Sequence, residues 1–600
     1  MNTITACRRF GTTLIVLASL MAVSVAHSQS TNSWIAPSGG KWERAIRWGD
    51  GLPSVTQSVV IISNANSKIV TINARTAHKF RSSLTISNLT VSAQDGVSNT
   101  LLLSRTGTIA LHILDGLTIG ISPDNSSGGG SELISTKSTL IVDGLLGGQL
   151  QDNGTVVIMG GSLITTNCSL EVATSSSSSS PAAGLLVISN GVVRARDVTI
   201  ASGNPSSGTI EVIGGTMTLS SSLTVGNGFQ NSPGSFLVAS GGLLVVTNDE
   251  TDIGGFNESS GSLTVSDASF LAADVFLGGT RSDGILAIND GSVTVNGQLG
   301  IGGGEQGSGS VSLNGGKLVV TNGETRLGLG TPSSGNMAVS RGLFRARDVY
   351  VGANQSTGGL FIDGGISILS SNLQIGVENS DATVSITGGQ LVVTNAPIVV
   401  DDQGQCIVSG GRLTARTIEL GRFAEGTLMV DGGSVTASEG ITLGDCSDDL
   451  AVGYASVDGG RVTVTNPTGT GFIDVRNGQL ILGSGVVHVD KLVMTNTCSS
   501  LIHTGGTLIV GSVVLDPEAF GVTSVVQEGD NLRVTWLMGP GQINALQGTS
   551  VRTYRHHTTN DFVDIFVVTN NTTPGVVTNY LDVGAATNIP PRLYRARLAP

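Results

Sequence analysis

The chain has 600 residues, of which 85 are glycine, and only 12% are charged and 4% aromatic. A net charge of −13 disfavours nucleic acid or an anionic membrane surface as the main partner, and an apolar content of 39% argues against a disordered chain. Abundant Gly, Ser, Thr, Asn and Val favour short β-strands joined by tight turns.

The first segment, residues 1–28, has the features of a signal peptide. Arg8 and Arg9 precede an apolar run over 14–25, and small residues end at Ser28. No later stretch reaches about 18 uninterrupted apolar residues, so we expect no membrane-spanning helix in the mature chain. The sequence therefore predicts an exported protein, extracellular or at the cell surface, with outer-membrane association included.

Residues 29–83 contain three of the four tryptophans, Trp34, Trp42 and Trp48. We expect this segment to be an N-terminal cap whose aromatic cluster covers the open apolar end of the repeats that follow. A platform on which carbohydrate rings stack is the alternative role of these tryptophans.

Residues 84–514 repeat themselves. Each step of about 25 residues contains a turn of two small residues and three short runs in which apolar and polar residues alternate. Alternation with period two predicts strands with one buried face, and three strands per step predict one rung of a solenoid. The small-residue turns lie at Gly161, Gly191, Gly215, Gly242, Ala268, Gly291, Gly316, Gly342, Gly365, Gly389, Gly411, Gly433, Gly460, Gly478 and Gly506.

A second, longer period overlies the first. The tripeptide VTN ends at Asn248, Asn322, Asn395 and Asn466, and similar phrases recur at the same three-rung spacing. The unit of duplication is therefore a block of three rungs. The asparagines are too far apart to form a ladder on adjacent rungs, and we expect them to cap strand ends. The fold class predicted is all-β: a parallel β-helix of three-strand rungs, on the order of 70 Å long for fifteen rungs.

Residues 515–600 lack the small-residue turns and contain short alternating strands with polar connections. We predict a small β-sandwich-like C-terminal domain.

The four later cysteines, Cys168, Cys406, Cys446 and Cys498, are too few for a disulfide framework, and we expect small, semi-buried residues. The absence of Cys-x-x-Cys gives a zinc site no support. The acidic residues of LGDCSDDL (443–450) lack the spacing of a calcium repeat. The sequence predicts neither a metal nor another cofactor.

Catalysis of glycan cleavage needs a cluster of carboxylates on one face. No histidine occurs between His112 and His488, and most acidic residues stand singly in turns. We therefore predict no catalytic residues and no enzyme activity.

The most regular polar feature is a set of arginines. Arg194 and Arg196 recur as Arg345 and Arg347, and once more as Arg416. Their offsets from the turn glycine place them on the outer face. Aspartates follow the pairs directly, so local ion pairs are one interpretation, and a cationic line that binds an acidic glycan is the other.

The phrase GG-x-L-x-V…I-G, the opening W-x₇-W-x₅-W-G-x-G-x-P and the tail NYLDVGAATNIPPRLYRARLAP resemble the autotransporter-passenger type of exported bacterial repeat protein. The resemblance implies an extended solenoid at the cell surface. The chain departs from it because we expect no C-terminal membrane β-barrel.

The leading functional prediction is a secreted, non-catalytic rod, structural or adhesin-like, whose partner is a polysaccharide or another cell surface. The alternative is a parallel β-helix that binds or cleaves glycans through the arginines or the N-terminal tryptophans.

Overall fold

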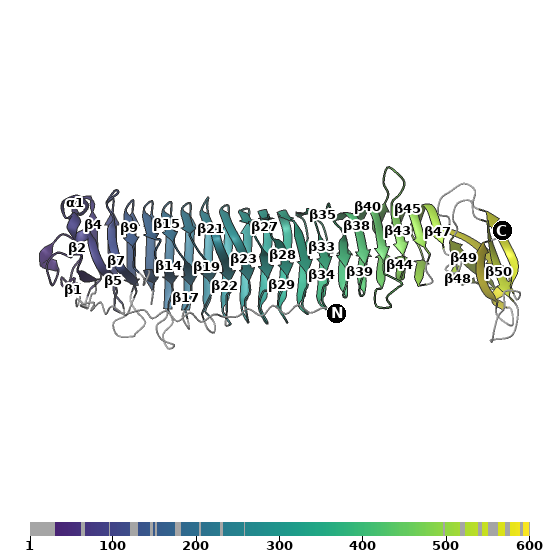
Figure 1. The fold of residues 1–600 in the computed structure, drawn as a ribbon, viewed down its shortest axis with the longest axis horizontal. Helices are drawn as coiled ribbons and strands as arrows, with labels where there is room; N and C mark the ends of the chain where they lie inside the picture. Colours follow the sequence, from purple (N-terminus) through teal and green to yellow (C-terminus); the bar gives the residue numbers. More distant parts are fainter. Residues whose placement is uncertain are drawn as a thin grey trace, which may run out of the picture.

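The computed structural model describes residues 30–61, 66–94, 96–120, 130–144, 148–150, 153–174, 182–202, 206–228, 232–256, 258–495, 498–515, 522–537, 543–549, 562–569, 577–587 and 592–598. They form a rod of parallel strands that ends in a small antiparallel domain (Figure 1). The predicted signal peptide, residues 1–28, lies outside the described residues.

Each rung contributes one strand to each of three parallel ladders, called A, B and C in chain order. The strands of ladder A are β2 (Gly40–Lys41), β4 (Lys68–Asn73), β6 (Ser98–Ser104), β8 (Gly130–Thr136), β11 (Gly154–Met159), β14 (Ala182–Ser189), β17 (Ser206–Ile213), β20 (Pro233–Ala239), β22 (Ser260–Ser266), β24 (Asp283–Asn289), β27 (Ser308–Val320), β29 (Ser334–Ala346), β31 (Thr357–Ile362), β34 (Asp381–Ile386), β37 (Gly404–Val408), β39 (Gly426–Val430), β41 (Gly453–Val457), β44 (Gly478–Leu482) and β46 (Ser499–His503).

Ladder B follows the small-residue turn and also takes the second halves of β27 and β29. Its other strands are β5 (Thr85–Val91), β7 (Leu111–Ile119), β9 (Thr139–Val142), β12 (Ser162–Thr165), β15 (Val192–Ala195), β18 (Thr216–Leu219), β21 (Leu243–Ile253), β23 (Ser269–Leu277), β25 (Ser292–Val295), β32 (Ile366–Leu369), β35 (Gln390–Val393), β38 (Arg412–Leu420), β40 (Ser434–Leu443), β42 (Arg461–Val464), β45 (Val486–Met494) and β47 (Thr507–Leu515).

Ladder C closes the rung and takes the second halves of β5, β7, β21, β23, β38, β40, β45 and β47. Its other strands are β1 (Ser30–Ser33), β3 (Gln57–Ile61), β10 (Gly148–Leu150), β13 (Leu170–Val172), β16 (Val198–Ile200), β19 (Leu223–Val225), β26 (Leu299–Ile301), β28 (Glu324–Leu327), β30 (Asp348–Val351), β33 (Leu373–Ile375), β36 (Ile398–Val400) and β43 (Phe472–Val475).

The described part of the chain contains about 18 rungs, counted along ladder A from β4 to β46. At about 4.8 Å per rung the stack is on the order of 85 Å long. The predicted alternation is confirmed: Leu318 and Val320 point inward and are buried, whereas Lys317 between the turn and Leu318 is exposed. The interior is one continuous apolar cluster that runs from Trp34 to Val513.

The small-residue turn recurs because successive rungs nearly touch there. A Cβ atom on Gly389 would lie 2.4 Å from the carbonyl oxygen of Gly365, so a larger residue has no room. One turn was assigned wrongly from the sequence: Gly478 begins β44 in ladder A, and the turn of that rung is at Gly485.

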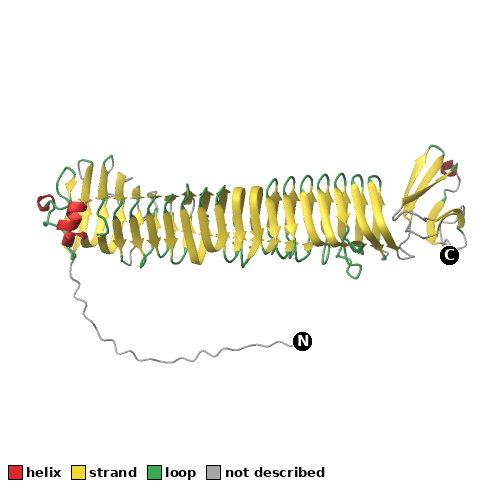
Figure 2. Cartoon of the chain, turned by 90° about the horizontal axis from the view of Figure 1, so that it is seen from above, coloured by secondary structure: helices red, strands yellow, loops and turns green. Residues whose placement is uncertain are grey.

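The segment predicted as a cap already belongs to the stack. Its strands β1–β4 pair in parallel with the strands of the following rungs. It also contains η1 (Ala45–Arg47), α1 (Ala74–Lys79) and η2 (Arg81–Leu84), which gather at the N-terminal end of the rod (Figure 2). The solenoid therefore begins at residue 30, and not at residue 84.

The predicted C-terminal β domain is confirmed as two antiparallel three-stranded sheets. They pack through Trp536 and Leu546, and Val577 packs on the solenoid core. No helix among the described residues is long and apolar enough to cross a membrane. The elements are β48 (Val522–Glu528), β49 (Asn531–Leu537), β52 (Val577–Asp582), β51 (Val563–Thr569), β50 (Ile543–Thr549), β53 (Leu593–Leu598) and η4 (Ala585–Thr587).

Candidate functional site

The three N-terminal tryptophans form a closed cluster. Trp48 lies 5.0 Å, centroid to centroid, from both Trp34 and Trp42, in edge-to-face geometry. All three side chains are buried, and each indole N–H donates to a backbone carbonyl. Because no ring offers a free face, these residues do not form a platform for carbohydrate. They extend the apolar core to the first rungs.

The five predicted arginines all point outward and are exposed. Arg194 and Arg345 lie on the outer face of ladder B, in β15 and β29, whereas the other three lie at the corner between ladders B and C. Three of the five are held in ion pairs: Arg196 with Asp197 at 2.6 Å, Arg347 with Asp348 at 2.6 Å, and Arg416 with Glu439 at 2.7 Å.

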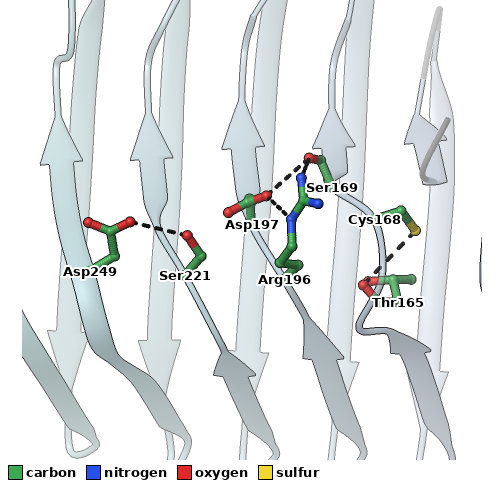
Figure 3. A network of polar contacts seen from close by, with 7 residues as sticks. All are labelled: Thr165, Cys168, Ser169, Arg196, Asp197, Ser221 and Asp249. Carbon is green, nitrogen blue, oxygen red and sulfur yellow. Dashed lines mark hydrogen bonds and ion pairs between the residues drawn. The ribbon is translucent and has the colours of Figure 1, made fainter. Parts of the chain in front are cut away.

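The paired aspartates also connect one rung to the next at this corner. Asp197 accepts from Arg196 and from the Ser169 hydroxyl of the preceding rung, and the adjacent rungs repeat the contact as Ser221 with Asp249 (Figure 3). Asp348 accepts the backbone N–H of Asn372 at 3.2 Å. The aspartate is therefore a structural acceptor between rungs, and its arginine neutralises it.

Electrostatics at these corners agree with that role. Partial burial raises the pKa of Asp348, but hydrogen bonds from Arg347, Ser371 and the backbone of Asn372 outweigh it and hold the pKa below its usual range. The pKa of Asp197 is lowered in the same way against burial, by Arg196, Ser221 and the backbone of Ser222. Both carboxylates are thus held in the charged form.

Arg194 and Arg345 differ from the other three, because no carboxylate of the described residues forms an ion pair with either of them. Six rungs separate them along ladder B, which is about 29 Å. The structure thus does not bring the predicted arginine line together into one compact site.

Three of the VTN asparagines connect neighbouring rungs. The side-chain amides of Asn248, Asn395 and Asn466 donate to the backbone carbonyls of Ser220, Ser370 and Ser438 of the preceding rung, at 3.2, 2.6 and 3.1 Å. Asn395 and Asn466 follow the ends of β35 and β42, as predicted, whereas Asn248 lies inside β21, where the register with β23 shifts between Val246 and Glu250.

The expectation of four small, unpaired cysteines is half right. Cys168 and Cys406 are buried and form no disulfide, but Cys446 and Cys498 form one, with their Cα atoms 6.3 Å apart. The two sulfur atoms meet because their loops follow β40 and β45, two rungs apart. The disulfide fixes the loop that connects β40 to β41, residues 444–452, called here the clamped loop.

Two surface hollows flank the clamped loop. The first, called the corner pocket, has a volume of about 380 Å³, and its walls include Glu419, Arg422, Thr442, Asp445, Phe472 and Arg476. The second has a volume of about 430 Å³ and a strongly acidic lining that includes Asp381, Asp402, Glu425 and Asp449. Sequence reasoning found neither, because each is assembled from residues of several rungs.

The corner pocket lies on the outer face of three adjacent strands of ladder C, in β38, β40 and β43. Register places Thr442 between Glu419 and Asp474. Glu419 pairs with Arg422 at 3.6 Å and Asp474 with Arg476 at 2.7 Å. The Thr442 hydroxyl thus lies between two guanidinium–carboxylate pairs, of which Glu419, Arg422 and Arg476 line the pocket.

An aromatic ring forms one end of the corner pocket. The Phe472 ring covers Gly440 on the neighbouring strand, where a Cβ atom would lie 2.4 Å from the ring. The opposite end is Asp445, whose carboxylate accepts from the backbone N–H and hydroxyl of Ser447 at 3.1 and 2.9 Å. These two hydrogen bonds, followed by the charge of Arg476, lower the pKa of Asp445.

No group of three or more His, Cys, Asp or Glu side chains in the described ranges could hold a metal ion. Asp445 and Asp448 instead accept hydrogen bonds from turn residues of the clamped loop. Comparison with models of known protein families, with curated proteins and with solved structures finds no match. The fold therefore defines the chain as a parallel β-solenoid.

Proposed function

We propose that the protein is an exported, non-catalytic rod of the autotransporter-passenger type, structural or adhesin-like. The observation that carries this proposal is the unbroken stack of about 18 rungs on one continuous apolar core. Because each rung pairs with the next along the described strands, the stack holds surface groups at fixed distances from its ends.

Two further observations support the proposal. The polar residues of the repeated corners connect rungs, as Asp348 does with Asn372. The disulfide between Cys446 and Cys498 fits an oxidising compartment outside the cytosol.

Fractionation of native cells tests the export, with an antibody against the chain. The protein is expected in the medium or at the cell surface, where added protease reaches it in intact cells. A chain confined to the cytosol would contradict the proposal. Incubation with soluble polysaccharides tests the non-catalytic part: release of new reducing ends or unsaturated products would overturn it.

A further inference from the structure

We propose that the corner pocket binds a neutral sugar ring of a glycan. Phe472 supplies the stacking surface, and the two guanidinium–carboxylate pairs supply hydrogen bonds to sugar hydroxyls. The site differs from the predicted arginine line and from the buried tryptophans. It goes beyond the proposed rod function, which does not depend on it.

The chemistry of the lining selects the ligand class. Guanidinium groups only donate hydrogen bonds and carboxylates only accept them, whereas a sugar hydroxyl does both. Arg422, Arg476 and Glu419 line the pocket, and each arginine is paired with a carboxylate: Arg422 with Glu419, and Arg476 with Asp474. Because each cation has its own carboxylate, the pocket has little field to attract a charged ligand, and Asp445 adds one further acceptor. A neutral, polyhydroxylated ligand matches this pattern better than an acidic or a basic one.

The apolar surfaces fit the faces of a sugar ring. Phe472 is half-buried and borders the pocket. Beside it, Arg422 lies over the ring of Phe423 at 5.0 Å, and Phe423 is 66% exposed. Flat aromatic rings next to polar side chains bury the C–H face of a sugar while its hydroxyls remain paired. A volume of about 380 Å³ is near the lower limit of ligand pockets, which suits one or two sugar units.

The pocket is rigid before any ligand binds. Its floor consists of three paired strands. Its Asp445 wall belongs to the clamped loop, which is held by the disulfide and by hydrogen bonds such as Asn477 to the carbonyl of Asp448 at 3.3 Å. A site built on strands and a cross-linked loop loses little entropy on binding.

Calorimetric titration of the full chain tests this proposal. The probes are cellohexaose, xylohexaose, mannohexaose and maltohexaose, with oligogalacturonate as the acidic comparison. We expect saturable binding of at least one neutral probe and none of the acidic one. Phe472→Leu, which keeps an apolar cover over Gly440, should weaken binding at least tenfold, as should Arg476→Ala.

The matched control is Arg347→Ala, which removes an exposed, ion-paired arginine from another corner and should leave the affinity within twofold. Thr442→Trp fills the pocket without removing a proposed contact and should abolish binding in a chain with an unchanged circular dichroism spectrum. The proposal is overturned if no neutral probe binds up to about 10 mM, if Thr442→Trp binds normally, or if oligogalacturonate alone binds. None of these results would alter the length or location of the rod, so the two proposals fail independently.

Discussion

Two regions of the solenoid derive from the same repeated block, residues 192–375 and residues 412–476. They differ at the corner between ladders B and C. In the first region an aspartate such as Asp348 accepts a backbone N–H from the next rung. In the second, Thr417 stands at that position, and the register with β40 shifts between Ala415 and Thr417. The clamped loop and the corner pocket lie directly beside this shift.

This difference shows which parts of a duplicated rung can change. Most inward residues of both regions remain apolar and buried, because every rung must cover its neighbours. Thr251, Thr325 and Ser367 are buried polar exceptions in the first region. The corners face solvent and need only satisfy their own backbone groups. A corner that no longer repeats its aspartate is therefore free to acquire loops, a disulfide and a ligand pocket.

The largest effect should come from the shared interior. Phe344→Ala removes a fully buried ring from β29 and should lower the free energy of unfolding by about 3–5 kcal/mol. Phe361→Ala, on the outer face of β31 where the ring is 37% exposed, should cost less than about 1 kcal/mol. Urea denaturation of both variants measures the contrast, and equal losses would contradict a stacked apolar core.

The second largest effect concerns the disulfide that holds the clamped loop. Replacing both Cys446 and Cys498 by Ser should lower the free energy of unfolding of the last rungs by about 2–4 kcal/mol. Amide hydrogen exchange in the clamped loop should accelerate while exchange in β15–β30 stays unchanged. Reductant should reproduce the effect in the wild type and do nothing to the double variant. Unchanged exchange in the loop would show that the disulfide does not hold the pocket wall.

A smaller effect is expected at a corner that keeps the repeated aspartate. Asp348→Ala leaves the N–H of Asn372 without its acceptor and should cost about 1–2 kcal/mol. Thr417→Ala, at the equivalent position of the divergent copy, should change stability by less than about 0.5 kcal/mol.

The pH dependence of this cost has a definite sign. Because the pKa of Asp348 is lowered in the folded state, its contribution is full above the ordinary aspartate value of about 3.9 and is lost as pH falls through the folded value. Denaturation of Asp348→Ala and the wild type at a series of pH values below 7 checks this, and a penalty that does not shrink at any acidic pH would exclude a role for the charged carboxylate.

The smallest effect concerns Asp252, on the outer face of β21. Burial, then Glu250 and Asp249, raise its pKa to about 6. The folded state therefore holds a proton that the unfolded state releases between about pH 4 and 6, and stability falls as pH rises through this window. Asp252→Asn should remove the fall and raise stability at pH 7 by up to about 1 kcal/mol, whereas Asp249→Asn removes only the smallest of the three causes and should leave most of the fall in place. Loss of stability at pH 7 in Asp252→Asn would contradict the assignment.

The fold was predictable because polarity alternates along each strand and a small residue recurs at the turn of each rung. Alternation assigns inward residues such as Leu318, and close approach between rungs restricts the turn column to small residues such as Gly389. The N-terminal boundary was missed because the first rungs contain a helix and an irregular, tryptophan-rich turn in place of the repeated phrase.

The site was less predictable, since it depends on which residues become neighbours across rungs. Cys446 and Cys498 are 52 residues apart, close to two rung lengths, and that spacing was an available signal for the disulfide. The pair of Phe472 and Gly440 is a second signal, because an outward-facing aromatic residue lies in register with a glycine on the neighbouring strand. Neither contact follows from the alternation within one rung, because each joins residues of different rungs.

The most direct test removes one complete block. Deleting residues 322–394 joins Thr321 to Asn395, at equivalent points of two copies. Cryo-electron microscopy should show parallel strands about 4.8 Å apart in both proteins, and a deletion variant that is folded and about 14 Å shorter than the wild type. A variant that fails to fold, keeps its length, or shows separate antiparallel sheets in place of the stack would contradict the account.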